Sequence, residues 1–341
     1  MKTIIRKSLL AAMFMTGCAS QGGDWPHGGG GGGGGGGEEE PEPVVEGSYA
    51  LESSLNLPDG YLADSAPYFD DFLGMTDDPD DPATWLLDRV EDRLGWFEAA
   101  ALATAREALG LDAIVNQLIL DNSPELVAEL VQLGGDMAEL SRGLEVSSRL
   151  TVREAAGGQL VADHEVVGLA FAIDGQVAPV EGIALPAAAR GLMVELDPEQ
   201  HVLRIDRHSF ALEQGALLRY GLEEVALPRV APGAASVTGW LAGEIDCAGI
   251  GAAVEDVVEV GSPSDYEDAC VAVIDRAVDE VIGGAFELRA QLALGGRADL
   301  ADDDGDGAYD LMSGTWQGSM TLAGAASALP MPISRFEGVR E

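Results

Sequence analysis

The chain has 341 residues, of which 59 are acidic and only 19 are lysine or arginine, so its formal net charge is −40. A charge this negative argues against nucleic acid and anionic lipid headgroups as partners, and it favours cations, calcium above all. Hydrophobic residues make up 47% of the chain, which is enough for a packed core. We therefore expect a folded body that binds no nucleic acid.

The first residues have the layout of an export signal. Lys2 and Arg6 give a positively charged start. A short apolar run over residues 9–15 follows, and small residues then precede Cys18. The run is too short to span a bilayer. We therefore expect residues 1–17 to be a signal peptide that is removed on export.

The sequence Met15-Thr16-Gly17-Cys18 resembles the lipobox of bacterial lipoproteins. In that family the cysteine is lipidated and becomes the first residue of the mature chain, so the resemblance implies acyl chains such as palmitate on Cys18. An Asp after the cysteine favours retention at the inner membrane, and here the residue is Ala19. The resemblance therefore implies a lipid anchor in the outer membrane, on its periplasmic face or at the cell surface. The alternative is a plain signal peptide with a chance cysteine.

Residues 18–46 have the composition of a tether. Ten consecutive glycines at Gly28–Gly37 precede the acidic, proline-containing segment 38–43. Such a segment cannot bury enough apolar surface to offset the entropy lost on ordering. We expect one folded domain over residues 47–341, and a subdivision near 228–239 is the alternative. The chain resembles lipoproteins of GC-rich, myxobacterial-type Gram-negative bacteria, and this resemblance implies an address but no activity.

The first half of the domain predicts one strand followed by helices. Alternation of apolar residues predicts a strand over 48–57. Apolar residues at helical spacing, together with cap residues, then predict a run of helices. These helices are expected at about 82–94, 96–109, 111–120 and from 123 onward.

The second half predicts mainly antiparallel hairpins. The period changes to two at Gly143, and the expected strands cover about 144–153, 160–171, 191–196, 202–212 and several segments between 286 and 340. A short helix is expected over 215–227, stopped by Pro228, and two further helices carry Cys247 and Cys270. In an exported protein this even pair predicts a disulfide, with two free buried thiols as the alternative.

These elements together predict an α+β fold. It begins with the N-terminal strand, continues with the helical section, and ends in an antiparallel sheet of hairpins with a disulfide-linked helical pair. The strands at both ends of the domain are expected to meet in one sheet, with helices packed over that sheet.

The strongest chemical motif is an acidic loop at residues 302–310. Alternating carboxylates followed by Gly307 resemble the first half of an EF-hand calcium loop, in which oxygen ligands surround a hard cation. The expected ligands are Asp302, Asp304, Asp306, the carbonyl of Ala308, and Asp310. An EF-hand closes with Glu where this chain has Ser313, so the site is weaker or is completed by Asp299 or Asp303. A solvated acidic turn is the alternative.

Other clusters do not predict a site. The aspartates of residues 70–81 lack the two-residue rhythm, which favours a solvated loop. On a regular strand His208 shares a face with Asp206 and His201 lies on the other, so the two histidines cannot bind one metal. His164 stands alone among acids. We therefore expect no catalytic or metal-binding role for a histidine.

The sequence leaves the activity open and leans away from an enzyme, because motifs for nucleophilic, zinc or phosphate chemistry are absent. Helices over an antiparallel sheet, rich in Leu and Val, favour a tethered binding protein for an apolar or lipid-like ligand, with structural calcium. The alternatives are an extracytoplasmic hydrolase without a recognisable motif and a calcium-stabilised surface scaffold or adhesion protein.

Overall fold

The computed structural model describes residues 44–59, 61, 82–91, 94–258, 260–276 and 287–341. The expected signal peptide, Cys18, most of the tether and the acidic cluster at 70–81 lie outside the described residues. The described chain belongs to one compact unit, Glu42–Glu341. None of its described helices has the length and apolar character needed to cross a membrane.

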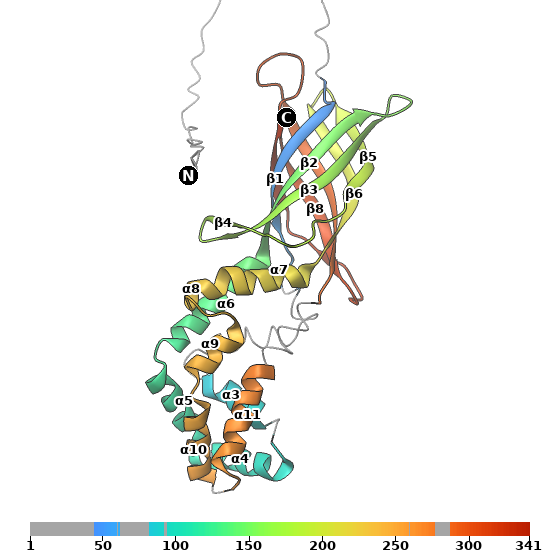
Figure 1. Cartoon of the computed structure of the whole chain (residues 1–341). Helices are drawn as coiled ribbons and strands as arrows, with labels where there is room; N and C mark the ends of the chain where they lie inside the picture. The colour runs from blue at the N-terminus through green and yellow to red at the C-terminus, as the bar shows by residue number, and fades with distance from the viewer. Residues whose placement is uncertain (1–43, 60, 62–81, 92–93, 259, 277–286) are drawn as a thin grey trace, which may run out of the picture. The chain divides into compact units, whose positions relative to one another are not determined.

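Antiparallel strands close into an eight-stranded barrel (Figure 1). The order around the barrel is β10-β1-β2-β3-β5-β6-β7-β8, and β8 pairs with β10 to close it. The strands are β1 (Gly47–Asn56), β2 (Gly143–Glu154), β3 (Leu160–Ile173), β5 (Ala189–Asp197), β6 (Val202–Leu212), β7 (Ala290–Ala301), β8 (Leu311–Leu322) and β10 (Ser334–Arg340). Two short strands lie off this path, β4 (Gln176–Pro179) beside β3 and β9 (Leu329–Pro330) beside β8.

The predicted α+β architecture is wrong. The expected strands are present and the two ends of the domain do meet, since Tyr49 on β1 lies opposite Arg340 on β10. The sheet, however, buries its apolar face against itself rather than under helices. Alternation along a strand shows that one face is buried, but it does not show what buries that face. Closure depends on the β8–β10 pairing, which no local pattern specifies.

Inward and outward residues alternate regularly around the barrel. On β1, Tyr49, Leu51 and Ser53 are buried, whereas Glu52 and Ser54 are exposed. A similar alternation along most of the other strands fills the inside of an eight-stranded barrel with side chains, as the diameter of such a barrel requires, whereas on β5 only Val194 is buried.

The centre of the barrel holds an aromatic stack that depends on small neighbours. The rings of Trp316 and Phe336 stack with their centroids 4.4 Å apart. A Cβ at Gly296 would lie 2.5 Å from the Trp316 ring, and a Cβ at Gly314 would lie 2.5 Å from the Phe336 ring. Glycine is therefore required at both positions, because a side chain would overlap the rings.

Helices occupy two insertions in the barrel sequence. The first lies between β1 and β2 and contains α3 (Pro82–Glu91), α4 (Trp96–Leu109), α5 (Leu111–Asn122) and α6 (Leu126–Arg142). The second lies between β6 and β7 and contains α7 (Gln214–Tyr220), the π-helix η1 (Gly221–Ala226), α8 (Leu227–Val230), α9 (Val237–Glu244), α10 (Cys247–Val258) and α11 (Pro263–Arg276). The predicted disulfide Cys247–Cys270 is present and joins α10 to α11.

The expected stop at Pro228 is wrong. Helical structure continues from Gln214 to Val230 because a π-helical segment, Gly221–Ala226, immediately precedes the proline. Proline lacks an N–H and clashes with the preceding turn of a regular α-helix. Pro228 lies at the start of α8, where the missing donor is tolerated.

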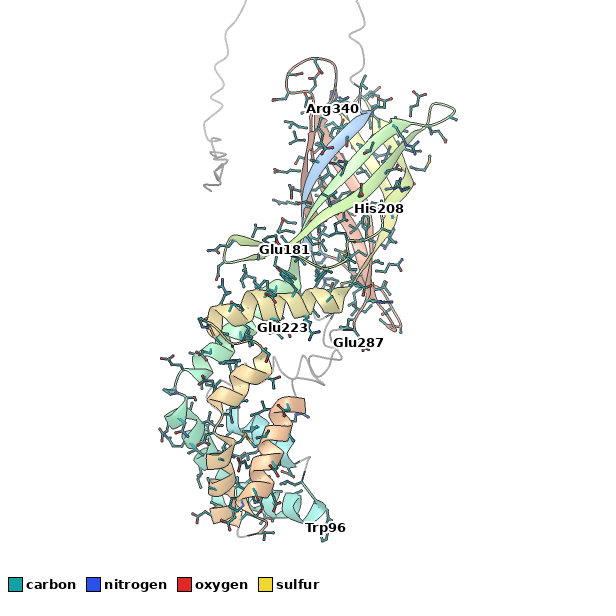
Figure 2. All side chains as sticks on the ribbon, in the orientation of Figure 1. Trp96, Glu181, His208, Glu223, Glu287 and Arg340 are labelled. Carbon is teal, nitrogen blue, oxygen red and sulfur yellow. A yellow bond between two sulfur atoms is a disulfide. The ribbon has the colours of Figure 1, made fainter. Side chains whose placement is uncertain are left out.

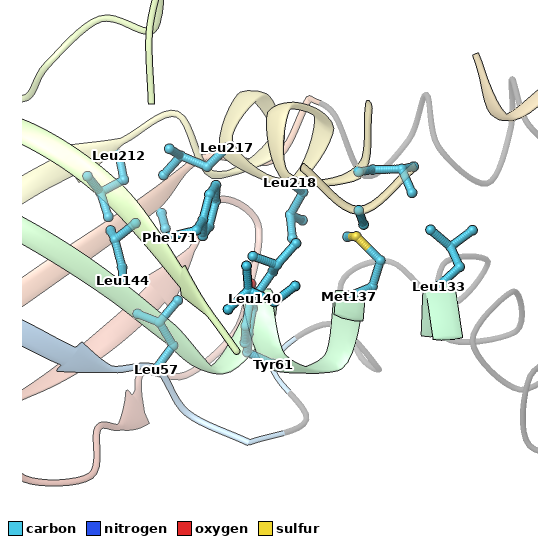
Figure 3. Close-up of a cluster of buried hydrophobic side chains, with 14 of the residues drawn as sticks. Leu57, Tyr61, Leu133, Met137, Leu140, Leu144, Phe171, Leu212, Leu217 and Leu218 are labelled. Atoms are coloured by element: carbon cyan, nitrogen blue, oxygen red, sulfur yellow. The ribbon is translucent and has the colours of Figure 1, made fainter. Parts of the chain in front are cut away.

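One end of the barrel is closed by side chains from both insertions (Figure 3). Leu140 from α6 and Leu217 from α7 belong to the same buried cluster as Leu144, Phe171 and Leu212 from the strands. We call these five residues the plug. The plug makes the helices and the barrel parts of one hydrophobic core.

Candidate functional site

An apolar cavity lies inside the barrel beside the aromatic stack. Its volume is about 20 Å³, close to the space that one water molecule occupies. Residues from six strands and from the β4–β5 connection line it. They are Ser53, Leu55, Leu144, Val146, Ser148, His164, Val166, Leu169, Pro186, Phe210, Leu212, Leu292, Leu294 and Trp316.

The polar groups at this cavity are paired with one another. Trp316 donates its indole N–H to the Ser53 hydroxyl at 3.1 Å. His164 lies 2.9 Å from Ser148 Oγ through Nε2 and 2.9 Å from His208 Nε2 through Nδ1. His208 Nδ1 in turn lies 2.9 Å from the carbonyl oxygen of Asp206. All five of these side chains are buried.

The carbonyl of Asp206 fixes the direction of this chain of hydrogen bonds. A carbonyl only accepts, so His208 Nδ1 carries a proton and donates it. In the neutral ring His208 Nε2 then accepts from His164 Nδ1–H, and His164 Nε2 accepts from the Ser148 hydroxyl. Each ring nitrogen has one partner, and both histidines are neutral.

Burial keeps both histidines neutral. Loss of hydration lowers the pKa of His164 to about 3, with a smaller contribution from His208. Burial also lowers the pKa of His208, and its bond to the Asp206 carbonyl opposes that shift. A buried charge without a counter-ion is costly, so protonation of either ring disfavours the folded state.

Sequence reasoning missed this pair because it assumed regular strands. The pairing of β6 with β7 shifts between Ile205 and His208, so both Asp206 and Arg207 are exposed and His208 points inward. The expected common face of His208 and Asp206 is therefore wrong. His164 follows the inward positions of β3 and meets His208 across the barrel interior. Figure 2 marks His208 among the strands.

His201 is not part of the pair. It adopts a positive φ of 53° in the β5–β6 turn. Its Nδ1 lies 2.7 Å from the hydroxyl of Tyr309, the residue that follows Ala308 in the acidic loop. This contact connects the β5–β6 turn to the acidic loop.

The acidic loop brings its carboxylates together. One oxygen each from Asp302, Asp304, Asp306 and Asp310 can lie within 4.8 Å of the others, a group that could hold a metal ion. Within the described chain this group does not extend to Asp299 or Asp303. Ser313 lies on β8, opposite Asp299.

Backbone N–H groups preorganise this loop. Gly305 and Gly307 donate to the two carboxylate oxygens of Asp302 at 2.7 and 3.0 Å. Asp306 donates its N–H to Asp304 at 3.1 Å, and Ala308 donates to Asp306 at 2.8 Å. Gly305 and Gly307 have φ of 74° and 89°, values that favour glycine. The loop therefore turns sharply while its acidic side chains converge.

The end of the tether contacts this loop. Val44 donates its N–H to the Gly307 carbonyl at 2.9 Å and accepts from the Tyr309 N–H at 3.1 Å. The short bridge between Val44 and Ala308 is parallel. The folded domain thus begins at the acidic loop.

The comparisons with known proteins add no family to this geometry. No protein-family model, curated protein or solved structure matches the chain.

Proposed function

We propose that this protein is an outer-membrane-tethered lipoprotein whose barrel binds an apolar or lipid-like ligand without transforming it. The observation that carries the proposal is the cavity beside Trp316. The polar side chains that line this cavity, including Ser148 and His164, are already hydrogen-bonded to other protein groups. Such a cavity offers a ligand apolar contact and no free charge, and eight-stranded barrels are among the folds that hold one small ligand.

The ligand enlarges the cavity as it binds. The present volume of about 20 Å³ admits no acyl chain. Leucine and valine side chains, including Val146 and Leu294, surround it and can change rotamer to make room. The gain in buried apolar area, roughly 25 cal/mol per Å², offsets part of this rearrangement.

A matched pair of variants tests binding. The full chain with Cys18→Ser is labelled with ¹⁵N-tryptophan, and decan-1-ol is titrated while the Trp316 indole signal, assigned with Trp316→Phe, is followed. Val146→Leu adds a methylene to the cavity wall and should weaken binding. Val152→Leu adds the same group to an inward position of β2 that does not line the cavity, and should leave binding unchanged. Absence of a change at Trp316 in the parent protein would contradict the proposal.

Hydrolysis is the alternative, and one observation favours it. Ser148, His164 and His208 form the order nucleophile, base and orienting group that hydrolases use. The low pKa of His164, about 3, makes it a weak base at neutral pH, because the imidazolium that it would form is buried without a counter-ion. Binding is therefore the better supported function. Ester hydrolysis that disappears in Ser148→Ala would reverse this ranking.

We propose that the lipid anchor is attached at Cys18. The acyl chains contribute about 0.8 kcal/mol for each buried methylene, so several chains hold the protein on the membrane. Cys18→Ser should move the protein from the membrane fraction to the soluble fraction of the cell. A Cys18→Ser protein that stays with the membrane would contradict the anchor.

We also propose that the acidic loop binds calcium and that the ion stabilises the fold. Close carboxylates repel one another, and a cation relieves that repulsion. Calcium should therefore raise the melting temperature of the wild type and not that of Asp304→Asn combined with Asp306→Asn. Asp303→Asn removes a charge from the same loop outside the group and should keep the response to calcium. Equal melting of the wild type with and without calcium would exclude the site.

A further inference from the structure

The barrel wall is incomplete on the side of β5. This strand pairs with β3 only through Ala189–Met193 and with β6 only through Val194–Asp197. No described residue of β5 therefore pairs with both neighbours. On the edge of β6 that faces β5, no described strand pairs with residues 206–212.

The wall is incomplete because the chain that pairs with β3 is interrupted between β4 and β5. β4 pairs with β3 at Ala170–Ile173, and the Val180 N–H continues that pairing to the Leu169 carbonyl at 2.8 Å. The chain then leaves β3 and returns to it only at Ala189. We call residues 181–188, which lie between these two paired stretches, the strap. Its path from β4 to β5 can be followed in Figure 1.

One strap residue reaches the cavity. Pro186 is buried and is the described strap residue that lines the cavity, together with Val166 and Leu169 of β3 and Phe210 and Leu212 of β6. These four residues belong to the strands on either side of the incomplete wall. Pro186 therefore separates the cavity from solvent at the place where no paired strand does so.

Apart from Pro186, the strap has one half-buried apolar side chain against the core, Ile183, and most of its other residues are exposed. Glu181, Gly182, Ala184, Leu185 and Ala187 are exposed, and Leu185 has 43% of its surface in water. A segment without strand pairing and with few buried side chains opens at a lower free energy than the strands around it. At the helix-covered end the plug consists of closely packed large side chains from two helices and three strands, and two of its residues, Leu144 and Leu212, also line the cavity.

We propose that the strap covers a side entrance to the barrel, and that the apolar ligand enters between β3 and β6 when Pro186 moves outward. This inference rests on the proposed binding function. The ligand therefore enters through the gap beside β5 and not through the helix-covered end of the barrel. The entrance is lined by apolar side chains, so it suits an uncharged, chain-like ligand.

The first test needs no ligand. In the full chain with Cys18→Ser, hydrogen exchange of the Trp316 indole N–H reports access of water to the cavity. Pro186→Ala should speed this exchange by roughly tenfold, which corresponds to about 1.4 kcal/mol in the opening equilibrium. Pro186→Phe enlarges the closing side chain and should slow it. Leu185→Ala shortens an exposed neighbour and should leave the rate unchanged.

The second test measures entry of the ligand. Pro186→Ala should speed both association and dissociation of decan-1-ol at the Trp316 signal, whereas Leu217→Ala in the plug should not. Rates equal to the parent in Pro186→Ala, acceleration by Pro186→Phe through loss of stability, or acceleration by Leu217→Ala alone would overturn the entrance. If decan-1-ol does not bind but indole exchange follows the predicted order, the binding function fails and the entrance stands.

Discussion

The barrel and the two helical insertions bury apolar surface by different means. The barrel brings together strands from distant parts of the sequence, as when β1 pairs with β10, in addition to sequential pairs such as β2 with β3 and β7 with β8. The interior of this barrel holds two hydrogen-bonded groups of polar side chains, Ser148–His164–His208 and Ser53–Trp316, together with stacked aromatic rings. The insertions contain short helices, and their packing is reinforced by a disulfide and by ion pairs. Backbone pairing around the barrel therefore accommodates polar side chains in the interior, whereas the helices are held together by additional side-chain links.

The links within the helices are specific. The Arg106 guanidinium contacts Asp88 at 2.6 Å, Glu91 at 3.2 Å and Asp112 at 2.8 Å. The hydrogen bond from Arg106 is the main cause of the lowered pKa of Asp112. These contacts join α3, α4 and α5 within the first insertion.

The two insertions are also linked to each other. Ser123 donates its hydroxyl to the Glu244 carbonyl at 2.6 Å, and Trp240 donates its indole N–H to Glu129 at 3.1 Å. Arg229 lies 2.8 Å from Asp136. Residues from both parts of the sequence therefore form one helical region.

The largest effect is expected in the barrel. Trp316→Ala removes the central ring and leaves Ser53 and His164 without their neighbour, so the free energy of unfolding should fall by about 3–5 kcal/mol. Urea denaturation measures this change. Trp96→Ala is the matched control, because 83% of Trp96 is exposed (Figure 2), and it should change stability by less than about 0.5 kcal/mol. Equal effects of the two variants would contradict the central role of the stack.

The second largest loss of stability is expected on removal of the disulfide, and the loss of amide protection should be confined to the helices that it joins. Replacing both Cys247 and Cys270 by Ser removes a link between residues 23 positions apart, which should lower stability by about 3 kcal/mol in the chain-entropy model. Amide hydrogen exchange should rise in α10 and α11 while β7 and β8 keep their protection. Uniform loss of protection would show that the barrel depends on the helices for its order.

The histidine pair makes stability depend on pH. His164 stays neutral in the folded protein down to a pKa of about 3, whereas in the unfolded chain it takes up a proton near pH 6.5. Its contribution is therefore complete above about pH 6.5 and is lost as the pH falls below that value, by up to about 1.4 kcal/mol per pH unit. The lowered pKa of His208 acts in the same direction.

Denaturation midpoints between pH 7 and 5 measure this dependence. His164→Gln should flatten the curve relative to the wild type. His201→Gln changes a histidine outside the pair and should leave the slope unchanged. A wild-type slope that His164→Gln does not alter would contradict the neutral pair.

The smallest effect is expected at Arg106. Arg106→Leu keeps apolar contact but removes three ion pairs, and it should cost about 1 kcal/mol because two of the partners are partly exposed. Arg204→Leu removes a 3.6 Å contact with Glu195 on the exposed barrel surface and should cost almost nothing. Thermal unfolding at low and high salt compares the two. A larger loss of stability in Arg204→Leu than in Arg106→Leu would contradict the view that ion pairs matter more in the helices than on the barrel.

Local elements could be predicted from the sequence because they depend on local periodicity. The strand at Gly47–Asn56 and the helix at Trp96–Leu109 lie where alternation and helical spacing predicted them. The acidic loop was also predictable, since Asp302 to Asp310 are close in sequence and gather in space. Its preference for calcium remains a prediction.

The cavity and the barrel closure could not be predicted because both depend on contacts between distant residues. His164 and His208 are 44 positions apart, and an irregularity in β6 decides which way His208 points. The β8–β10 pairing that closes the barrel leaves no mark on either strand alone. The extra exposed residue at Asp206–Arg207 was the one available signal, because two polar residues there interrupt the alternation between Ile205 and His208.

The most direct test of the binding function is native mass spectrometry of the full chain with Cys18→Ser, isolated without chelator from cells that make the lipids of an outer membrane. We expect extra mass from an acyl-containing molecule, released on denaturation and reduced in Val146→Leu but not in Val152→Leu. The mass of the bare chain, with or without calcium, in all three proteins would contradict the binding function.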